Sequence, residues 1–109
     1  MAWRIRDRAT FEALRRSGTR ARRGPVTVTY AAVGAAPEPR VAYAIGRRVG
    51  TAVVRNRVRR RLRAAVGTVD ELAPGAYLVA AGADAAGQTY EELREEVAQA
   101  MTSASGGGR

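Results

Sequence analysis

The residues best suited to bind a partner are the arginines between Arg47 and Arg63, where eight of seventeen residues are arginine. A guanidinium group stays charged and offers a planar fork of N–H donors that matches a phosphate. Apolar residues nevertheless recur at every fourth position, at Val54, Val58 and Leu62. A solvated tail would not keep that spacing, whereas a helix docked on a core by one stripe would. The segment therefore predicts a packed helix that presents arginines to a polyanion, and a folded RNA is the favoured class of partner.

The same spacing separates the two sides of this helix. At about 100° per residue, the apolar stripe comprises Val54, Val58, Leu62 and Ala65. The arc away from the stripe carries Arg55, Asn56, Arg59, Arg60 and Arg63, while Arg57 and Arg61 flank the stripe. A solvated basic face without a partner is the alternative interpretation. A second group of arginines at positions 20, 22 and 23 favours a binding surface instead.

Length and composition favour one folded domain. The chain has 109 residues, of which 46% are apolar, so a modest core is available. The net charge is +9 at pH 7, and all 19 basic residues are arginine. A GC-rich genome accounts for the lack of lysine but does not explain where the arginines cluster. A polyanionic partner would relieve the self-repulsion of this charge.

Several classes of reactive site are excluded because the chain has no cysteine and no histidine. Disulfides, thiol nucleophiles, histidine bases and Cys/His zinc sites all need those residues. Four carboxylates have helical spacing and are predicted to form a solvated acidic face, not a metal or acid–base cluster: Glu91, Glu92, Glu95 and Glu96. We therefore predict no catalytic residue and no metal ligand.

The elements that must position the arginines follow from periodicity, turns and caps. They are a helix over 7–17, a basic loop over 19–25, strands over 26–30 and 40–45, a helix from the Thr51 cap to about Val66, a strand over 76–81 and a helix over 90–101. Thr89 and Glu92 form the capping box of the last helix. This order predicts an α+β domain.

We find no internal repeat and no linker, so residues 1–102 are predicted to form one domain. Residues 103–109 are small and Gly-rich and are predicted to be a disordered tail. The N-terminal residues do not resemble a secretory signal, and no apolar run approaches the roughly 18 residues of a membrane span. We therefore expect a cytoplasmic protein.

At these residues the chain resembles the protein component of bacterial ribonuclease P. That family carries a basic pair, a glycine and then Arg-Asn-Arg followed by further basic residues on one helix. The matching residues are Arg47, Arg48, Gly50, Arg55, Asn56, Arg57, Arg59, Arg60 and Arg63. The similarity extends from about Arg4 to Met101 and includes Phe11 in the first helix and the Thr-Tyr-Glu-Glu start of the last one.

The resemblance implies a single α+β domain of α-β-β-β-α-β-α order. Its helices pack on a four-stranded sheet, and the Arg-Asn-Arg helix lies in a β-α-β crossover between parallel strands. In the family that crossover is left-handed, against the general preference for right-handed connections.

The resemblance also implies a function. The holoenzyme removes the 5′ leader of precursor tRNA, and its RNA subunit holds the catalytic site and uses Mg²⁺. The implied role of the protein is to bind that RNA subunit through the polar residues of the motif. These are Arg47, Arg48, Arg55, Asn56, Arg57, Arg59, Arg60 and Arg63. A cleft implied to hold the leader is lined by Phe11, Arg15, Thr27 and Thr29. The implied partners are the RNA subunit and precursor tRNA. No membrane, obligate protein partner or cofactor of the protein alone is implied.

The chain departs from the family pattern at several positions. Thr51 replaces a frequent asparagine, Arg15 stands where a second aromatic residue is expected, and Thr27 and Thr29 replace larger residues. Gly82 and Ala83 stand where basic residues often follow the last strand. Such a cleft would stack bases less and rely more on charge.

Two other functions compete with this one. A general nucleic-acid-binding module, such as a ribosomal protein, would also carry a basic helix. A self-sufficient nuclease is the weakest hypothesis, because the chain has few groups for the chemistry.

Overall fold

The computed structural model describes residues 3–5, 8–32 and 38–106. Its elements are β1 (Trp3–Arg4), α1 (Arg8–Ser17), β2 (Thr19–Arg23), β3 (Val26–Ala31), β4 (Pro39–Ile45), η1 (Arg47–Val49), α2 (Ala52–Gly67), β5 (Gly75–Ala81), η2 (Ala83–Gly87) and α3 (Tyr90–Ala104). The short elements η1 and η2 are 3-10 helices. The predicted α+β class and the α-β-β-β-α-β-α order implied by the resemblance are confirmed.

The strands form one mixed sheet in the order β1-β4-β5-β3-β2. Strands β4 and β5 are parallel neighbours joined through α2, whereas β3 pairs antiparallel with both β5 and β2. The four strands implied by the resemblance are therefore all present, whereas periodicity alone predicts only three of them. The two-residue β1 adds a short fifth strand beside the first half of β4.

The prediction of a basic loop over 19–25 is wrong, because most of that segment is the edge strand β2. Ala21 pairs with Val28 and is buried, so the strand points one apolar side chain into the core. The neighbouring residues are arginines, which hid the alternation expected of a strand. A turn at Gly24, whose φ is +57°, returns the chain into β3.

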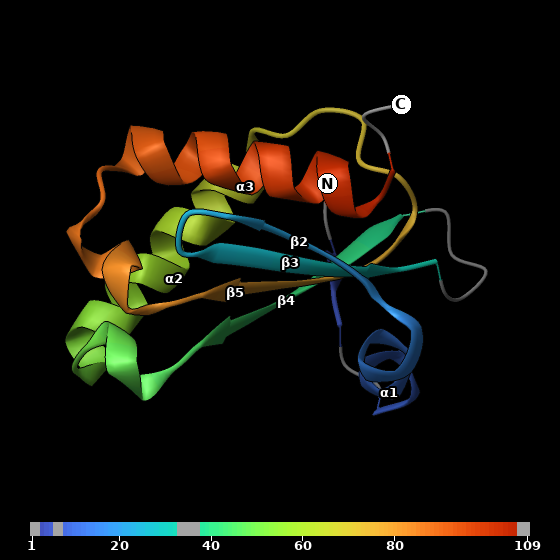
Figure 1. Cartoon of the computed structure of the whole chain (residues 1–109), viewed down its shortest axis with the longest axis horizontal. Coiled ribbons are helices and arrows are strands. Elements are labelled where there is room, and N and C mark those ends of the chain that lie inside the picture. The colour runs from blue at the N-terminus through green and yellow to red at the C-terminus, as the bar shows by residue number, and fades with distance from the viewer. Residues whose placement is uncertain (1–2, 6–7, 33–37, 107–109) are drawn as a thin grey trace.

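The two faces of the sheet are covered differently. Helices α2 and α3 pack on one face and α1 lies on the other (Figure 1). The larger core lies under α2 and α3, and its fully buried side chains include Val28, Leu62, Tyr77 and Leu93. Alternation along β3 and β5 sends one set of side chains into this core and the other toward α1.

Helix α1 makes a smaller second core with Leu14 against Ala31 and Ala76. Its end lies so close to the sheet that a Cβ on Gly18 would collide with the carbonyl of Leu14 and a methyl group of Thr29. Glycine therefore permits the close approach of α1 to β3.

The acidic helix α3 begins as predicted. The Thr89 hydroxyl accepts a hydrogen bond from the Glu92 amide at 3.1 Å, and the Glu92 carboxylate accepts one from the Thr89 amide at 2.9 Å. The helix ends at Ala104, beyond the predicted end at Met101, because Ala104 is buried in the core. Residues 103 and 104, assigned to the predicted tail, thus belong to α3, and residues 107–109 lie outside the described residues.

Replacing Thr89 with Ala removes the side-chain half of the capping box. We expect the free energy of unfolding to fall by about 1 kcal/mol, measured by urea denaturation. Thr102→Ala, an exposed position in the same helix, is the control. An equal loss in the two variants would contradict the assigned role of the cap.

Two tyrosines anchor the start of β5 within the larger core. The rings of Tyr30 and Tyr77 lie 4.9 Å apart, and their hydroxyls donate to the carbonyls of Pro74 at 2.6 Å and Ala73 at 2.7 Å. Burial raises the pKa of Tyr77 from 10.0 to about 12. Both tyrosines therefore have a structural role in holding the start of β5.

The raised pKa of Tyr77 predicts a loss of stability in alkali. The unfolded chain releases this proton near pH 10, before the folded chain does, so the stabilisation is complete below pH 10 and is lost as the pH rises to about 12. Denaturation midpoints measured across this range should fall less steeply in Tyr77→Phe. A parallel fall in both proteins would contradict the assignment.

Candidate RNA-binding surface

The arginine-rich helix α2 starts at a well-defined point. Gly50 has a φ of +150°, and a Cβ there would approach Val54 Cγ1 to 2.9 Å, so the link from η1 requires glycine. The Thr51 hydroxyl then accepts a hydrogen bond from the Val54 amide at 3.4 Å. The predicted cap is confirmed, and η1 holds Arg47 and Arg48 exposed beside the start of α2.

The apolar stripe docks α2 as expected, but it is wider than predicted. Val58, Leu62 and Ala65 are buried, and Val66 is buried with them. Val66 widens the buried side toward Arg55 and Arg59, which are half-buried instead of lying on the fully outward arc. The exposed polar side chains of the helix are Asn56, Arg57, Arg60 and Arg63.

Several of these arginines are held by contacts within the fold. Arg59 donates to the Asn56 side chain at 3.1 Å, and Arg61 donates to the carbonyl of Gln88 at 3.2 Å. The Arg63 guanidinium lies 5.9 Å from the ring centre of Tyr43 on β4. None of these contacts neutralises the positive charge.

The arginines of η1 and α2 form no ion pair with a carboxylate among the described residues. Within residues 3–5, 8–32 and 38–106, the ion pairs join Arg8 to Glu12 at 3.7 Å and Arg94 to Glu91 at 2.8 Å. Neither pair includes an arginine of η1 or α2. The fold therefore leaves this surface positive and able to attract phosphates.

The four residues predicted to line the leader cleft differ in how exposed their side chains are. Phe11 is 36% exposed on α1, and Arg15, one turn later, is exposed. Thr27 is half-buried on the sheet face that α1 shares. Thr29 is only 8% exposed, because the end of α1 covers it. The structure thus brings Thr27 to an accessible surface but not Thr29.

Beyond α1, the sheet ends in an open pocket of about 320 Å³. Its wall includes Arg22, Thr27, Ala80, Gly82, Ala83 and Asp84. Thr27 and Ala80 are paired across β3 and β5 and form part of the floor. The side chains around the floor are short, so this part of the sheet face is accessible.

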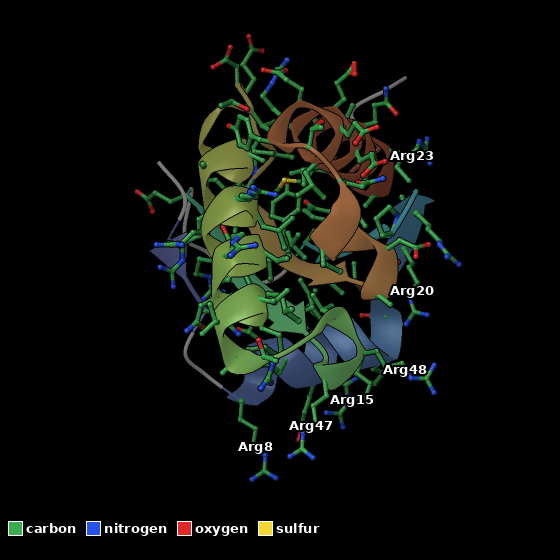
Figure 2. The ribbon with its side chains drawn as sticks, turned by 90° about the vertical axis from the view of Figure 1, so that its left-hand side faces the viewer. Arg8, Arg15, Arg20, Arg23, Arg47 and Arg48 are labelled. Carbon is green, nitrogen blue, oxygen red and sulfur yellow. The ribbon has the colours of Figure 1, made fainter. Side chains whose placement is uncertain are left out.

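More arginines surround this surface than the motif contains. Figure 2 shows Arg8 and Arg15 of α1, Arg20 and Arg23 of β2, and Arg47 and Arg48 of η1 along the lower and right-hand margin, pointing outward. Arg8 and the β2 arginines were not among the predicted site residues. Their clustering in sequence was the available signal, but only the strand pairing places them beside the other elements.

The comparisons with known proteins agree with this geometry. A family model described as Ribonuclease P matches residues 1–105. The chain belongs to the family of bacterial ribonuclease P proteins. The ribonuclease P protein component of Beutenbergia cavernae is 39% identical over 102 residues, which cover 92% of this chain and 86% of that one.

Other relatives and solved structures give the same result. The Micrococcus luteus component is 43% identical over 79 residues, which are 65% of this chain, and the match spans 60% of the relative's length. The Staphylococcus aureus RNase P protein has the same fold, with a TM-score of 0.82, 20% identity and coverage of 95% of this chain and 96% of that one. The Thermotoga maritima RNase P protein has a TM-score of 0.73 at 17% identity, with 88% and 92% covered.

Two features of the described residues bear on the kind of site present. No helix there is long and apolar enough to cross a membrane. No three or more Asp, Glu, His or Cys side chains of that part of the chain lie together to hold a metal ion. The surface offers charge and hydrogen-bond donors for binding.

Replacing an exposed arginine of α2 should change the salt dependence of RNA binding. For Arg57→Ala, Arg60→Ala or Arg63→Ala, we expect the slope of log K against log salt to shrink by about one, because one phosphate contact is lost. Arg94→Ala, which removes an arginine paired with Glu91, is the matched control. Unchanged slopes in all three variants would show that these side chains face only solvent.

Proposed function

We propose that this chain is the protein subunit of ribonuclease P. It binds the catalytic RNA subunit and the 5′ leader of precursor tRNA, and so assists Mg²⁺-dependent endonucleolytic removal of the leader. The observation that carries the proposal is the set of arginines on η1 and α2 without carboxylate partners among the described residues, on a fold shared with ribonuclease P proteins. Family membership supports the association with a ribonuclease P RNA.

In this proposal, η1 and α2 bind the RNA subunit. Permanently charged guanidinium groups bind phosphates through paired N–H donors, and a helix spaces them at fixed intervals. The residues assigned to this contact are Arg47, Arg48, Arg55, Asn56, Arg57, Arg59, Arg60 and Arg63. Arg55 and Arg59 are half-buried, so they would use the outer ends of their side chains.

The leader is assigned to the sheet face beside α1. Phe11 supplies an aromatic surface on which a base can stack, and Arg15 supplies charge one helical turn away. Thr27 offers a hydroxyl, while the coverage of Thr29 leaves it little contact area. This composition favours binding of the leader mainly through its phosphates.

Catalysis itself is assigned to the RNA subunit. Phosphodiester hydrolysis needs a water activated as the nucleophile and a means to stabilise the leaving oxygen. Mg²⁺ held by the RNA would activate the water and stabilise the charge on the leaving oxygen. The protein would contribute by holding the two RNAs together, without a cofactor of its own or an obligate protein partner. A cytoplasmic location completes the proposal, since precursor tRNA is made there.

Reconstitution tests the proposal. With a bacterial ribonuclease P RNA at physiological Mg²⁺, the protein should accelerate single-turnover cleavage of precursor tRNA. Phe11→Ala should weaken binding of leader-bearing tRNA by roughly tenfold, because stacking of one base is lost. Binding of mature tRNA, which lacks the leader, should be unaffected.

The controls separate this function from general RNA binding. A general RNA-binding module would prefer neither the ribonuclease P RNA over an unrelated structured RNA nor leader-bearing over mature tRNA. No stimulation by a folded protein would overturn the proposal. Stimulation without leader dependence would retain the contact with the RNA subunit and remove the leader assignment.

A further inference from the structure

The pocket at the open end of the sheet has features that the proposed function does not use. It is bordered by two groups of opposite charge, Arg22 from β2 and Asp84 from η2. Both are exposed, yet Asp84 makes no hydrogen bond or ion pair with any residue that the structure describes. The Arg22 Nε donates to the carbonyl of Gly24 at 3.1 Å. The Asp84 carboxylate is thus available to a ligand.

The pocket is open because the chain turns with very small residues. Ala80, Gly82 and Ala83 line it and carry no atoms beyond Cβ. A longer side chain at position 82 or 83 would occupy this space. The volume of about 320 Å³ is at the small end of ligand pockets, about 300–1,000 Å³, which suits one flat group and not a duplex.

The surroundings indicate the class of ligand. The chain carries a net positive charge, and the arginines of β2 and η1 lie on this side of the molecule. A segment of RNA is therefore the polymer that this side attracts. In single-stranded RNA a base can leave the stack and present its edge to side chains. A carboxylate in such a pocket selects the edge that offers it donors.

Guanine fits these two groups best. Its Watson–Crick edge presents the N1–H and the N2 amino group side by side, so one carboxylate accepts from both. Its O6 and N7 acceptors lie on the neighbouring edge, where an arginine can donate. Uracil instead flanks its single N–H with two carbonyl oxygens, which a carboxylate repels, and adenine offers one amino group.

We infer that the pocket between Arg22 and Asp84 binds one guanine base of the single-stranded leader. This inference rests on the proposed function, because it uses the leader as the source of the base. Asp84 is assigned the N1–H and N2 amino contacts, and Arg22 the acceptor edge. The site would add a base preference to a surface that otherwise binds phosphates.

The test uses the reconstituted holoenzyme and precursor tRNAs in which one guanine is moved along an otherwise all-uridine leader. At one position, guanine should tighten binding by roughly tenfold over uridine, the size expected of one two-point base contact. Inosine, which lacks the N2 amino group, should show a smaller gain. In Asp84→Asn the guanine gain should disappear, while Asp70→Asn, an exposed aspartate outside the pocket, should retain it.

Two readouts distinguish a base contact from a general effect of charge. If Asp84 only repels phosphates, Asp84→Asn tightens binding of all-uridine and guanine leaders equally, which would overturn the inference. Ala83→Arg should fill the pocket, abolish the guanine gain and still increase overall affinity. A guanine gain that survives both variants would also refute the site.

The binding measurements distinguish failure of this site from failure of the proposed function. Preference for leader-bearing over mature tRNA without any guanine gain removes the pocket and keeps the leader assignment. Absence of any leader dependence overturns both together.

Discussion

The docking of α2 on the sheet is the interaction on which the surface depends. Five arginine pairs of the helix stand three or four residues apart, and each costs about 0.2–0.5 kcal/mol. Burial of Val58, Leu62 and Val66 contributes about 1.5–3 kcal/mol for each side chain. The apolar contact therefore exceeds the repulsion, and the helix forms with its arginines still charged. Ion pairs with acidic side chains would relieve the repulsion further, but they would also cancel the positive field that can attract a polyanion.

The sheet supports this helix with one face and leaves the other partly accessible. Alternation puts Val26, Val28 and Val79 under the two large helices. On the opposite side it puts mostly small residues, with Leu78 as the large exception. Helix α1 covers only one end of that opposite side, where Thr29 lies beneath it. Small side chains near Thr27 need no further cover, because they expose little apolar surface. A binding face can therefore exist without an exposed apolar patch.

Much of this arrangement could be predicted from the sequence, because local signals specify it. The caps at Thr51 and Thr89 and the stripe of α2 depend on residues within one or two turns of each other. Strand β2 was missed because an edge strand needs only one buried residue, Ala21, and its arginines resemble a loop. The end of α3 was missed because the burial of Ala104 depends on tertiary packing.

The candidate site was less predictable for the same reason. An ideal helical wheel cannot tell how far a neighbouring element reaches around the helix, so it placed Arg55 and Arg59 too far outward. It also cannot show that α1 covers Thr29, or that residues of β2 and η2 meet around one pocket. These features join segments that are distant in sequence, and only the strand register brings them together.

In the proposed function, specificity for a folded RNA would come from the rigidity of this surface. Phosphate contacts carry no sequence information, so a general basic tail would bind any RNA. Here Asn56 restrains Arg59, the Gln88 carbonyl restrains Arg61, and the ring of Tyr43 lies against the guanidinium of Arg63. Immobilising a fully free side chain on binding costs about 0.5–1.5 kcal/mol. A side chain that is already restrained loses less entropy, so each restraint lowers this cost. A fixed pattern of charges gains this advantage only with an RNA whose phosphates match its spacing. If the proposed function holds, the packing that builds the helix therefore also selects the partner.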